Sequence, residues 1–340
     1  MSLRKLVATT LLFIVPVLSA SAGVSPGVES NTRAFLEALN SSGGTPLEQL
    51  PVEDARNVLV GAQQGAELPS ARVEERTITV DGESIDLVIV KPAGRQRSDL
   101  PVFMYFHGGG WVLGDFPTHE RLIRDLVVRS GAAAVYVDYT PSPEARYPTA
   151  INQAFAATQW VAENGSEIGV DGSRLAVAGN SVGGNMAAVV SLKAKQAGGP
   201  RIRFQLLLWP VTDASFENAS YQAYGQNHFL TTPMMQWFWD NYTTDPKERN
   251  EIFASPLRAT VEQLENLPPA LIQTAEMDVL RDEAEAYARK LNEAGVSVTS
   301  IRYNGMIHDF GLLNPLANVP AVQDSLDQAG VALKKYLFKE

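Results

Sequence analysis

The chain has 340 residues, of which 45% are hydrophobic and 19% charged, with 26 Gly and 20 Pro. This composition excludes global disorder and a collagen-like repeat, and it allows a large buried core. The formal net charge of −10 argues against nucleic acid or an anionic membrane surface as a partner. Cysteine is absent, which excludes disulfides, thiolate metal sites and a cysteine nucleophile.

The first 22 residues have the pattern of a signal peptide. Two cations precede an apolar run over 6–18, and Ala20 and Ala22 have the A-x-A spacing of a cleavage site. The run is short for a span of about 20 residues and a proline interrupts it, so cleavage is favoured over an uncleaved anchor. We therefore expect an exported protein, periplasmic or secreted, with no membrane span in the mature chain and one domain over 23–340.

The stretch that follows, about 27–69, has helix-like apolar spacing broken by a turn-rich segment, and it is interpreted as a cap element. The period then changes to that of strands. Residues 76–80 and 85–91 are predicted to form a hairpin, because Asp81 and Gly82 between them are a strong two-residue turn signal.

From residue 101 onward, short apolar runs alternate with amphipathic stretches, which is typical of a mostly parallel sheet covered by helices on both faces. The strand candidates are 102–106, 133–137, 175–178, 204–209, 270–274 and 298–303. The helix candidates are 119–129, 150–164, 184–196, 282–294 and 321–338. The predicted fold class is therefore α/β.

One interval, 212–256, breaks this alternation, because it holds far more chain than a crossover needs and is rich in aromatic residues. Insertions of this kind lie at the carboxyl ends of strands, where ligands bind, so we interpret it as a second cap element. Most of its aromatic side chains are expected only to pack the insertion onto the core.

Residues 179–183 read Gly-Asn-Ser-Val-Gly, a G-x-S-x-G pattern between a strand candidate and a helix candidate. The bare pattern is a weak signal. At a strand-to-helix turn, however, it lifts Ser181 above the sheet as a nucleophile, and the following helix directs free N–H groups towards developing negative charge. The alternative is a tight turn with a capping serine.

Residues 107–111 read His-Gly-Gly-Gly-Trp directly after a strand candidate. Consecutive glycines are expected where backbone N–H groups approach a ligand closely. With Ser181 as nucleophile, the N–H groups of Gly108, Gly109 and Val182 are predicted to hold the oxyanion of a tetrahedral intermediate. The alternative is a flexible loop with a structural histidine.

A serine nucleophile needs a base, and the chain has four histidines. The chain order Ser, acid, His selects His308, which follows the last strand candidate. His107 is expected to brace the glycines, His119 lies on a helix candidate, and His228 lies in the insertion. The alternative for His308 is a surface imidazole.

The acid should follow the preceding strand candidate, 270–274, and Asp278 is the best placed residue there. Its role would be to hold the imidazole tautomer and to stabilise the imidazolium. Glu276 and Asp282 are the alternatives, and they are more simply explained as a strand-end residue and a helix N-cap.

Together these motifs resemble those of the bacterial branch of the hormone-sensitive lipase family within the α/β-hydrolases. Five motifs in the family's order carry the resemblance: 107–111, 138–148, 179–184, 278–282 and 305–310. The resemblance implies an α/β-hydrolase fold with a helical cap built from 27–69 and 212–256. It also implies a carboxylesterase that hydrolyses short- to medium-chain acyl esters through an acyl-enzyme, without a cofactor or metal, and that can form a homodimer.

Three residues depart from the family pattern. The chain has Asn180 and Val182 where the family usually has Asp and Ala, and Trp209 where Tyr is commoner. Val182 supplies the same backbone N–H while its bulk narrows the site. The sequence gives no role for Asn180.

Other functions remain open at this level. An amidase, lactonase or carbamate hydrolase would use the same triad, because all of these reactions pass through a tetrahedral intermediate. A lipase acting at lipid–water interfaces would need an exposed apolar lid helix, and none is evident, although the aromatic insertion keeps this alternative open. A non-catalytic small-molecule binder, as in the plant gibberellin receptors that the family resembles, would be expected to lack a triad residue.

Overall fold

The computed structural model describes residues 23–94 and 99–339. This part of the chain is built around one mixed β-sheet. Its strand order is β1-β2-β4-β3-β5-β6-β7-β8. The strands are β1 (Ala71–Val80), β2 (Glu83–Pro92), β3 (Leu100–Phe106), β4 (Ala133–Asp138), β5 (Val170–Asn180), β6 (Ile202–Leu208), β7 (Ala270–Met277) and β8 (Val298–Ile307). β2 pairs antiparallel with β1 and β4, and all other neighbours are parallel. The predicted α/β class with a mostly parallel sheet is confirmed.

The predicted hairpin forms around the expected turn. Val80 pairs with Glu83, and the two residues between them have φ angles of 51° and 86°, as a two-residue hairpin turn requires. β1 begins five residues before the predicted strand. Most of β1 is exposed, so its first half has no apolar pattern that the sequence could show. At β6 the predicted strand, 204–209, begins two residues too late and ends one residue too late: Trp209 has a φ of 37° and lies outside the strand.

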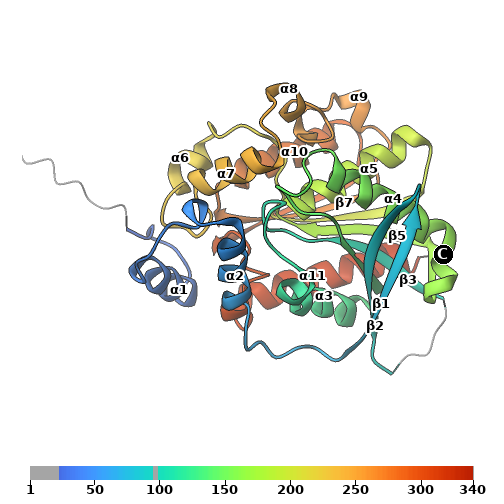
Figure 1. Cartoon of the computed structure of the whole chain (residues 1–340), viewed down its shortest axis with the longest axis horizontal. Coiled ribbons are helices and arrows are strands. Elements are labelled where there is room, and N and C mark those ends of the chain that lie inside the picture. The colour runs from blue at the N-terminus through green and yellow to red at the C-terminus, as the bar shows by residue number, and fades with distance from the viewer. Residues whose placement is uncertain (1–22, 95–98, 340) are drawn as a thin grey trace, which may run out of the picture.

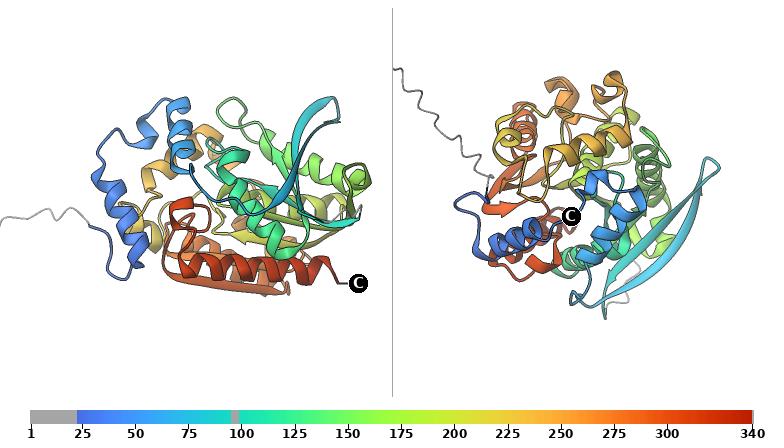
Figure 2. Two further views of the ribbon diagram at one scale, coloured as in Figure 1. Left: turned by 90° about the horizontal axis from the view of Figure 1, so that it is seen from below. Right: turned by 60° about the vertical axis from the view of Figure 1, so that its left-hand side comes forward.

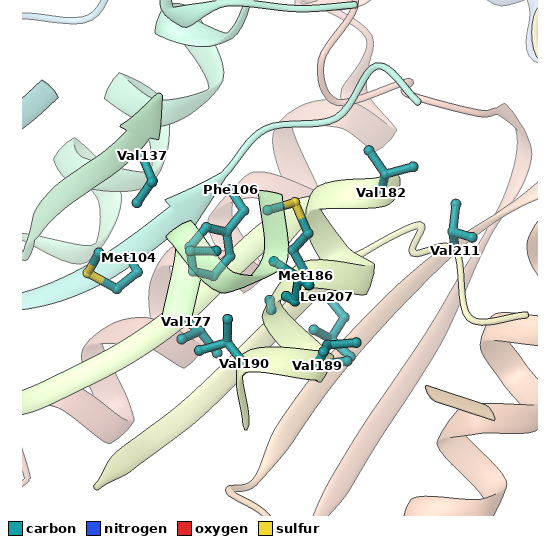
Figure 3. Packing of buried hydrophobic residues seen from close by; sticks show 14 of the residues in the cluster. Met104, Phe106, Val137, Val177, Val182, Met186, Val189, Val190, Leu207 and Val211 are labelled. Atoms are coloured by element: carbon teal, nitrogen blue, oxygen red, sulfur yellow. The ribbon is translucent and has the colours of Figure 1, made fainter. Parts of the chain in front are cut away.

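Helices cover both faces of the sheet (Figure 1). On one face lie α3 (Phe116–Ser130) and α11 (Pro320–Leu337), and on the other α4 (Thr149–Asn164), α5 (Val182–Ala197) and α10 (Arg281–Glu293). Along β3 the side chains alternate between the two cores: Phe103 packs with the first face, and Met104 and Phe106 with the second. Phe106 of β3, Val177 of β5 and Met186 of α5 are among the side chains that pack in this second core (Figure 3).

Two further groups of helices lie together at one end of the molecule (Figure 2). The N-terminal group has α1 (Ser30–Ser41) and α2 (Val52–Ala62), and the insertion has α6 (Ala219–Tyr224), α7 (Thr232–Tyr242) and α8 (Pro246–Arg249). The groups touch where the rings of Phe35 and Phe229 lie 6.1 Å apart and where Asn40 Nδ2 donates to the Asn227 carbonyl. Short helical turns complete the described chain: Leu47–Gln49, Gly165–Ile168, Pro256–Arg258, α9 (Val261–Leu264) and Asn314–Leu316.

The predicted signal peptide lies outside the described residues. Within the described ranges, every helix is too short or too polar to cross a membrane.

Candidate active site

Ser181 occupies a sharp turn between β5 and α5. Its φ of 55° and ψ of −123° are rare for a residue with a side chain, and its N–H donates to the Leu208 carbonyl at 2.9 Å. Glycines make the close backbone packing possible: a Cβ at Gly183 would lie 1.9 Å from the carbonyl oxygen of Phe106, and one at Gly179 2.2 Å from that of Gly183. The turn therefore has the geometry of a nucleophile elbow.

Three residues from separate elements form a chain of hydrogen bonds at this turn. His308 follows β8, and its Nε2 lies 3.0 Å from Ser181 Oγ. Asp278 follows β7, and its Oδ2 accepts from His308 Nδ1 at 2.8 Å. The Leu280 N–H donates to the other oxygen of Asp278 at 2.9 Å. The structure thus brings together the three residues that the sequence predicts as nucleophile, base and acid.

All three side chains are buried, with exposed fractions of 4% for Ser181, 2% for His308 and 1% for Asp278. Burial lowers the pKa of His308, but the charges of Asp278 and Asp309 act in the opposite direction and the net pKa is raised above the usual imidazole value. Because the Asp278 carboxylate accepts from Nδ1, the neutral imidazole carries its lone pair at Nε2, towards Ser181. His308 can therefore accept a proton from the serine hydroxyl.

The glycine loop after β3 differs from the sequence prediction at one position. The Gly108 N–H donates to Asn180 Oδ1 at 3.1 Å and to His119 Nε2 at 3.2 Å, so it already has two acceptors. Gly109 and Gly110 have positive φ angles of 98° and 66°. Within the described ranges, the N–H groups of Gly109, Gly110 and Val182 donate no hydrogen bond. These three N–H groups are therefore available to a ligand, whereas that of Gly108 is in use.

His107 braces this loop, as the sequence suggests. Its Nδ1–H donates to the Gly108 carbonyl at 2.8 Å and its ring stacks on Tyr139 with centroids 4.2 Å apart. Burial lowers the pKa of His107 to about 4, so the ring is neutral at neutral pH. The other two histidines also have structural partners: His119 accepts from the loop, and His228 Nε2 accepts from the Ser25 N–H at 3.3 Å.

The insertion packs directly on the glycine loop. The Phe238 ring of α7 occupies the space beside Gly110, where an added Cβ would lie 2.0 Å from a ring carbon. Trp111 stacks on Tyr242 with centroids 3.9 Å apart and meets Trp239 edge-on. Aromatic residues of the insertion therefore pack against the loop, as the sequence leads us to expect.

Sequence reasoning missed Asp309, which directly follows His308. Its carboxylate is nearly buried, and its Oδ1 accepts from Asn180 Nδ2 at 2.9 Å and from Trp209 Nε1 at 2.5 Å. The only signal in the sequence is its position next to His308. No cluster of His, Asp and Glu suited to a metal ion occurs among the residues that the structure describes.

Comparison with known proteins agrees with this geometry. A family model described as alpha/beta hydrolase fold matches residues 103–312. Carboxylesterase NlhH of Mycobacterium tuberculosis is 39% identical over 272 residues, which cover 79% of this chain and 84% of the relative. An ethyl acetate hydrolase of Pseudomonas putida is 33% identical over 291 residues, 81% of this chain and 88% of that protein.

Among solved structures, a thermostable esterase from Pseudomonas putida ECU1011 superposes with a TM-score of 0.92 at 71% sequence identity, over 93% of this chain and 100% of that chain. The sheet topology, the turn at Ser181 and these similarities agree with one another. The chain belongs to the α/β-hydrolases, in the hormone-sensitive lipase branch that includes carboxylesterases.

Proposed function

We propose that the protein is a serine carboxylesterase that hydrolyses short- to medium-chain acyl esters through an acyl-enzyme intermediate. The observation that carries this proposal is the hydrogen-bonded chain from Ser181 through His308 to Asp278, set in a nucleophile elbow. The relatives named carboxylesterase and ethyl acetate hydrolase support an ester as the substrate.

In the first half of the reaction, His308 Nε2 takes the proton of Ser181 as its Oγ attacks the ester carbonyl carbon. The carbonyl π electrons move to oxygen, and the oxyanion accepts hydrogen bonds. When the tetrahedral intermediate collapses, the bond to the alcohol oxygen breaks, and this oxygen receives the proton from His308. In the second half, His308 deprotonates a water that attacks the acyl-enzyme, and the carboxylic acid leaves as Ser181 regains its proton.

The oxyanion hole in this scheme consists of the N–H groups of Gly109, Gly110 and Val182. Two arguments support this set over one that includes Gly108: the Gly108 N–H already has two acceptors, and the other three N–H groups have no acceptor among the described residues. The N-terminal position of Val182 in α5 adds the positive end of the helix dipole.

Three further features belong to the same proposal. Segments 27–69 and 212–256 form the cap that encloses the acyl group, and their contacts with each other and with the glycine loop support this. The chain is exported after cleavage near Ala22, which N-terminal sequencing of the secreted or periplasmic protein tests. A homodimer would form through the edge strand β8, and light scattering measures the mass that decides it.

The test is hydrolysis of p-nitrophenyl esters from acetate to palmitate by the mature chain and by Ser181→Ala. Ser191→Ala serves as a matched control, because Ser191 lies in α5, directly after the turn that holds Ser181, and the bond from its hydroxyl to the Ala187 carbonyl is local to that helix. We expect activity that is highest for the shorter acyl chains, lost in Ser181→Ala and retained in Ser191→Ala.

A different outcome would identify a different reaction. If no ester is hydrolysed while a fluorophosphonate labels Ser181, the triad is competent and the ester assignment is wrong; amides, lactones and carbamates are then the substrates to try. If Ser181 is not labelled and no substrate reacts, the proposed function is wrong, and a non-catalytic small-molecule binder is the function to test next.

A further inference from the structure

A buried network connects the base of the proposed reaction to the glycine loop through two residues that the mechanism above does not use, Asn180 and Asp309. Asp309 is 7% exposed and has a φ of 56°, in the left-handed region that residues with side chains rarely adopt. Donors from Asn180 and Trp209 both reach its Oδ1. The strained backbone and the two donors fix the direction of this carboxylate.

The second oxygen of Asp309 faces the imidazole of His308. Asp309 Oδ2 lies 3.7 Å from His308 Nε2, the same nitrogen that contacts Ser181 Oγ at 3.0 Å. This separation is too long for a hydrogen bond, so the interaction is electrostatic, and burial reduces its screening by solvent. His308 thus has one carboxylate at each nitrogen: Asp278 at Nδ1 and Asp309 near Nε2.

Asn180 joins this carboxylate to the glycine loop. Its side chain is completely buried, and its Oδ1 accepts from Tyr105 Oη at 2.8 Å and from the Gly108 N–H at 3.1 Å. Its Nδ2 donates to Asp309 Oδ1 at 2.9 Å. An amide can accept on one side and donate on the other, whereas an ionised carboxylate at position 180 would place a second negative charge against Asp309.

We propose that Asn180 and Asp309 are a positioning pair for the ester hydrolysis proposed above. Asp309 stabilises the positive charge that develops at His308 Nε2, and Asn180 holds the glycine loop, through Gly108, in a fixed position relative to that imidazole. The inference rests on the proposed function, because it needs His308 to accept the Ser181 proton.

Titratable groups from several elements surround the pair. From α3, His119 Nε2 accepts from the same Gly108 N–H as Asn180, and the charge of Arg121 acts on Tyr105. Asp278 faces His308 from the end of β7, Asp309 faces it from its own loop, and Ser181 faces it from the start of α5. On β3, burial and the charge of Asp309 raise the pKa of Tyr105 well above its usual value, so its hydroxyl remains a donor to the amide.

The first test is Asp309→Asn, which keeps the oxygen that the donors use and replaces the charged oxygen near His308 by a neutral amide. We expect the plateau value of kcat/KM to fall by roughly 10-fold and the acid limb of its pH profile to move down by about 0.5 to 1 pH unit. The sign follows from the lost negative charge, which lowers the pKa of His308. A residue with only a structural role would lower the rate without moving the limb.

The second test is Asn180→Asp. In this variant the carboxyl groups at positions 180 and 309 face each other, and they share one proton up to a pH above the usual carboxyl range. The shared proton takes the place of the amide N–H with which Asn180 donates to Asp309. When that proton is lost at higher pH, the two charges repel and the link to the glycine loop breaks. We expect a new alkaline limb that wild type lacks, and we expect Asn180→Asp combined with Asp309→Asn to abolish it, since the double variant has no like-charged pair.

The measurements are kcat/KM for p-nitrophenyl acetate and the rate of fluorophosphonate labelling of Ser181, both from about pH 5 to 9. Asp327→Asn is the control for net charge, because Asp327 is exposed and pairs with Arg129 on the surface. We expect this control to leave both limbs unchanged. Circular dichroism shows whether each variant is folded.

The outcomes separate the two proposals. If wild type neither hydrolyses esters nor reacts with the fluorophosphonate, the proposed function is wrong. If wild type is active and the acid limb of folded Asp309→Asn coincides with that of wild type, Asp309 does not act on the imidazole and the inference is wrong. Should Asp309→Asn not fold, the profile of Asn180→Asp decides: an alkaline limb supports the pair, and its absence overturns it.

Discussion

Gln63, at the C-terminal end of α2, connects the N-terminal helices to the turn that follows His308. Its side chain is 8% exposed, and its Nε2 donates to the carbonyls of Thr118 at 2.9 Å and Leu312 at 2.8 Å. Its Oε1 accepts from the Asn314 N–H at 2.9 Å. We predict that Gln63→Ala destabilises the protein by loosening this connection.

The size of the effect follows from which groups lose their partners. In the variant, the Leu312 carbonyl still accepts from Arg121, and the Thr118 carbonyl still belongs to the hydrogen-bond ladder of α3. Neither carbonyl is left without a donor, so the loss of each hydrogen bond to Gln63 lowers the free energy of unfolding by only about 1 kcal/mol. The Asn314 N–H loses the one acceptor that it has among the described residues, which costs a further ~1–3 kcal/mol. The expected total is roughly 3–5 kcal/mol.

Thermal unfolding against Gln64→Ala provides the matched comparison, because Gln64 is the next residue and its side chain is exposed. For a chain of this length, 1 kcal/mol moves the midpoint by about 1.5 °C, so Gln63→Ala should unfold roughly 4.5–7.5 °C below Gln64→Ala. A difference of less than about 1 °C would refute the reasoning, because it would mean that the three hydrogen bonds add nothing to stability.

Three other predictions concern the active site and its surroundings. Gly110→Ala should lower kcat by about 100-fold or more in initial-rate assays, because the new methyl group overlaps the Phe238 ring and displaces the Gly110 N–H, a proposed oxyanion donor. An unchanged kcat would exclude the Gly110 N–H as a donor. In wild type, kcat/KM should fall as pH falls through a midpoint above the usual imidazole value, since the pKa of His308 is raised and only its neutral form accepts a proton; a midpoint below that value would contradict the geometry. Burial raises the pKa of Glu283 well above its usual value, so wild type should lose stability as pH rises above the pKa that this carboxyl group has in the unfolded chain. Glu283→Gln should remove that loss. Thermal unfolding midpoints of the two proteins that change in parallel from about pH 5 to 8 would contradict this.

The strands and the sharp turn could be predicted because their signals are local. Apolar runs mark the buried strands, and the two-residue turn at 81–82 needs only its own backbone angles. The first half of β1 could not be predicted, since an exposed strand at the sheet edge has no apolar pattern. Its pairing with β2 is what defines it.

The candidate site also has residues that the sequence predicts and residues that it does not. Ser181, Asp278 and His308 each follow a recognisable strand, and parallel strands bring their carboxyl ends to one edge of the sheet, so the order of motifs predicts their meeting. Gly108 was predicted as an oxyanion donor because the motif shows three glycines and does not show which N–H is already used. Its acceptors, Asn180 and His119, lie far away along the chain or on the next helix.

The sequence by itself determined the α/β class, the nucleophile elbow and the residues that line up at it, because periodicity and turn chemistry act over a few neighbouring residues. Only the tertiary structure decided how Asn180 and Asp309, 129 positions apart, share a hydrogen bond beneath the base, and how Gln63 reaches a turn near the C-terminus. Such contacts depend on distances and directions in the folded core, and no local pattern encodes them.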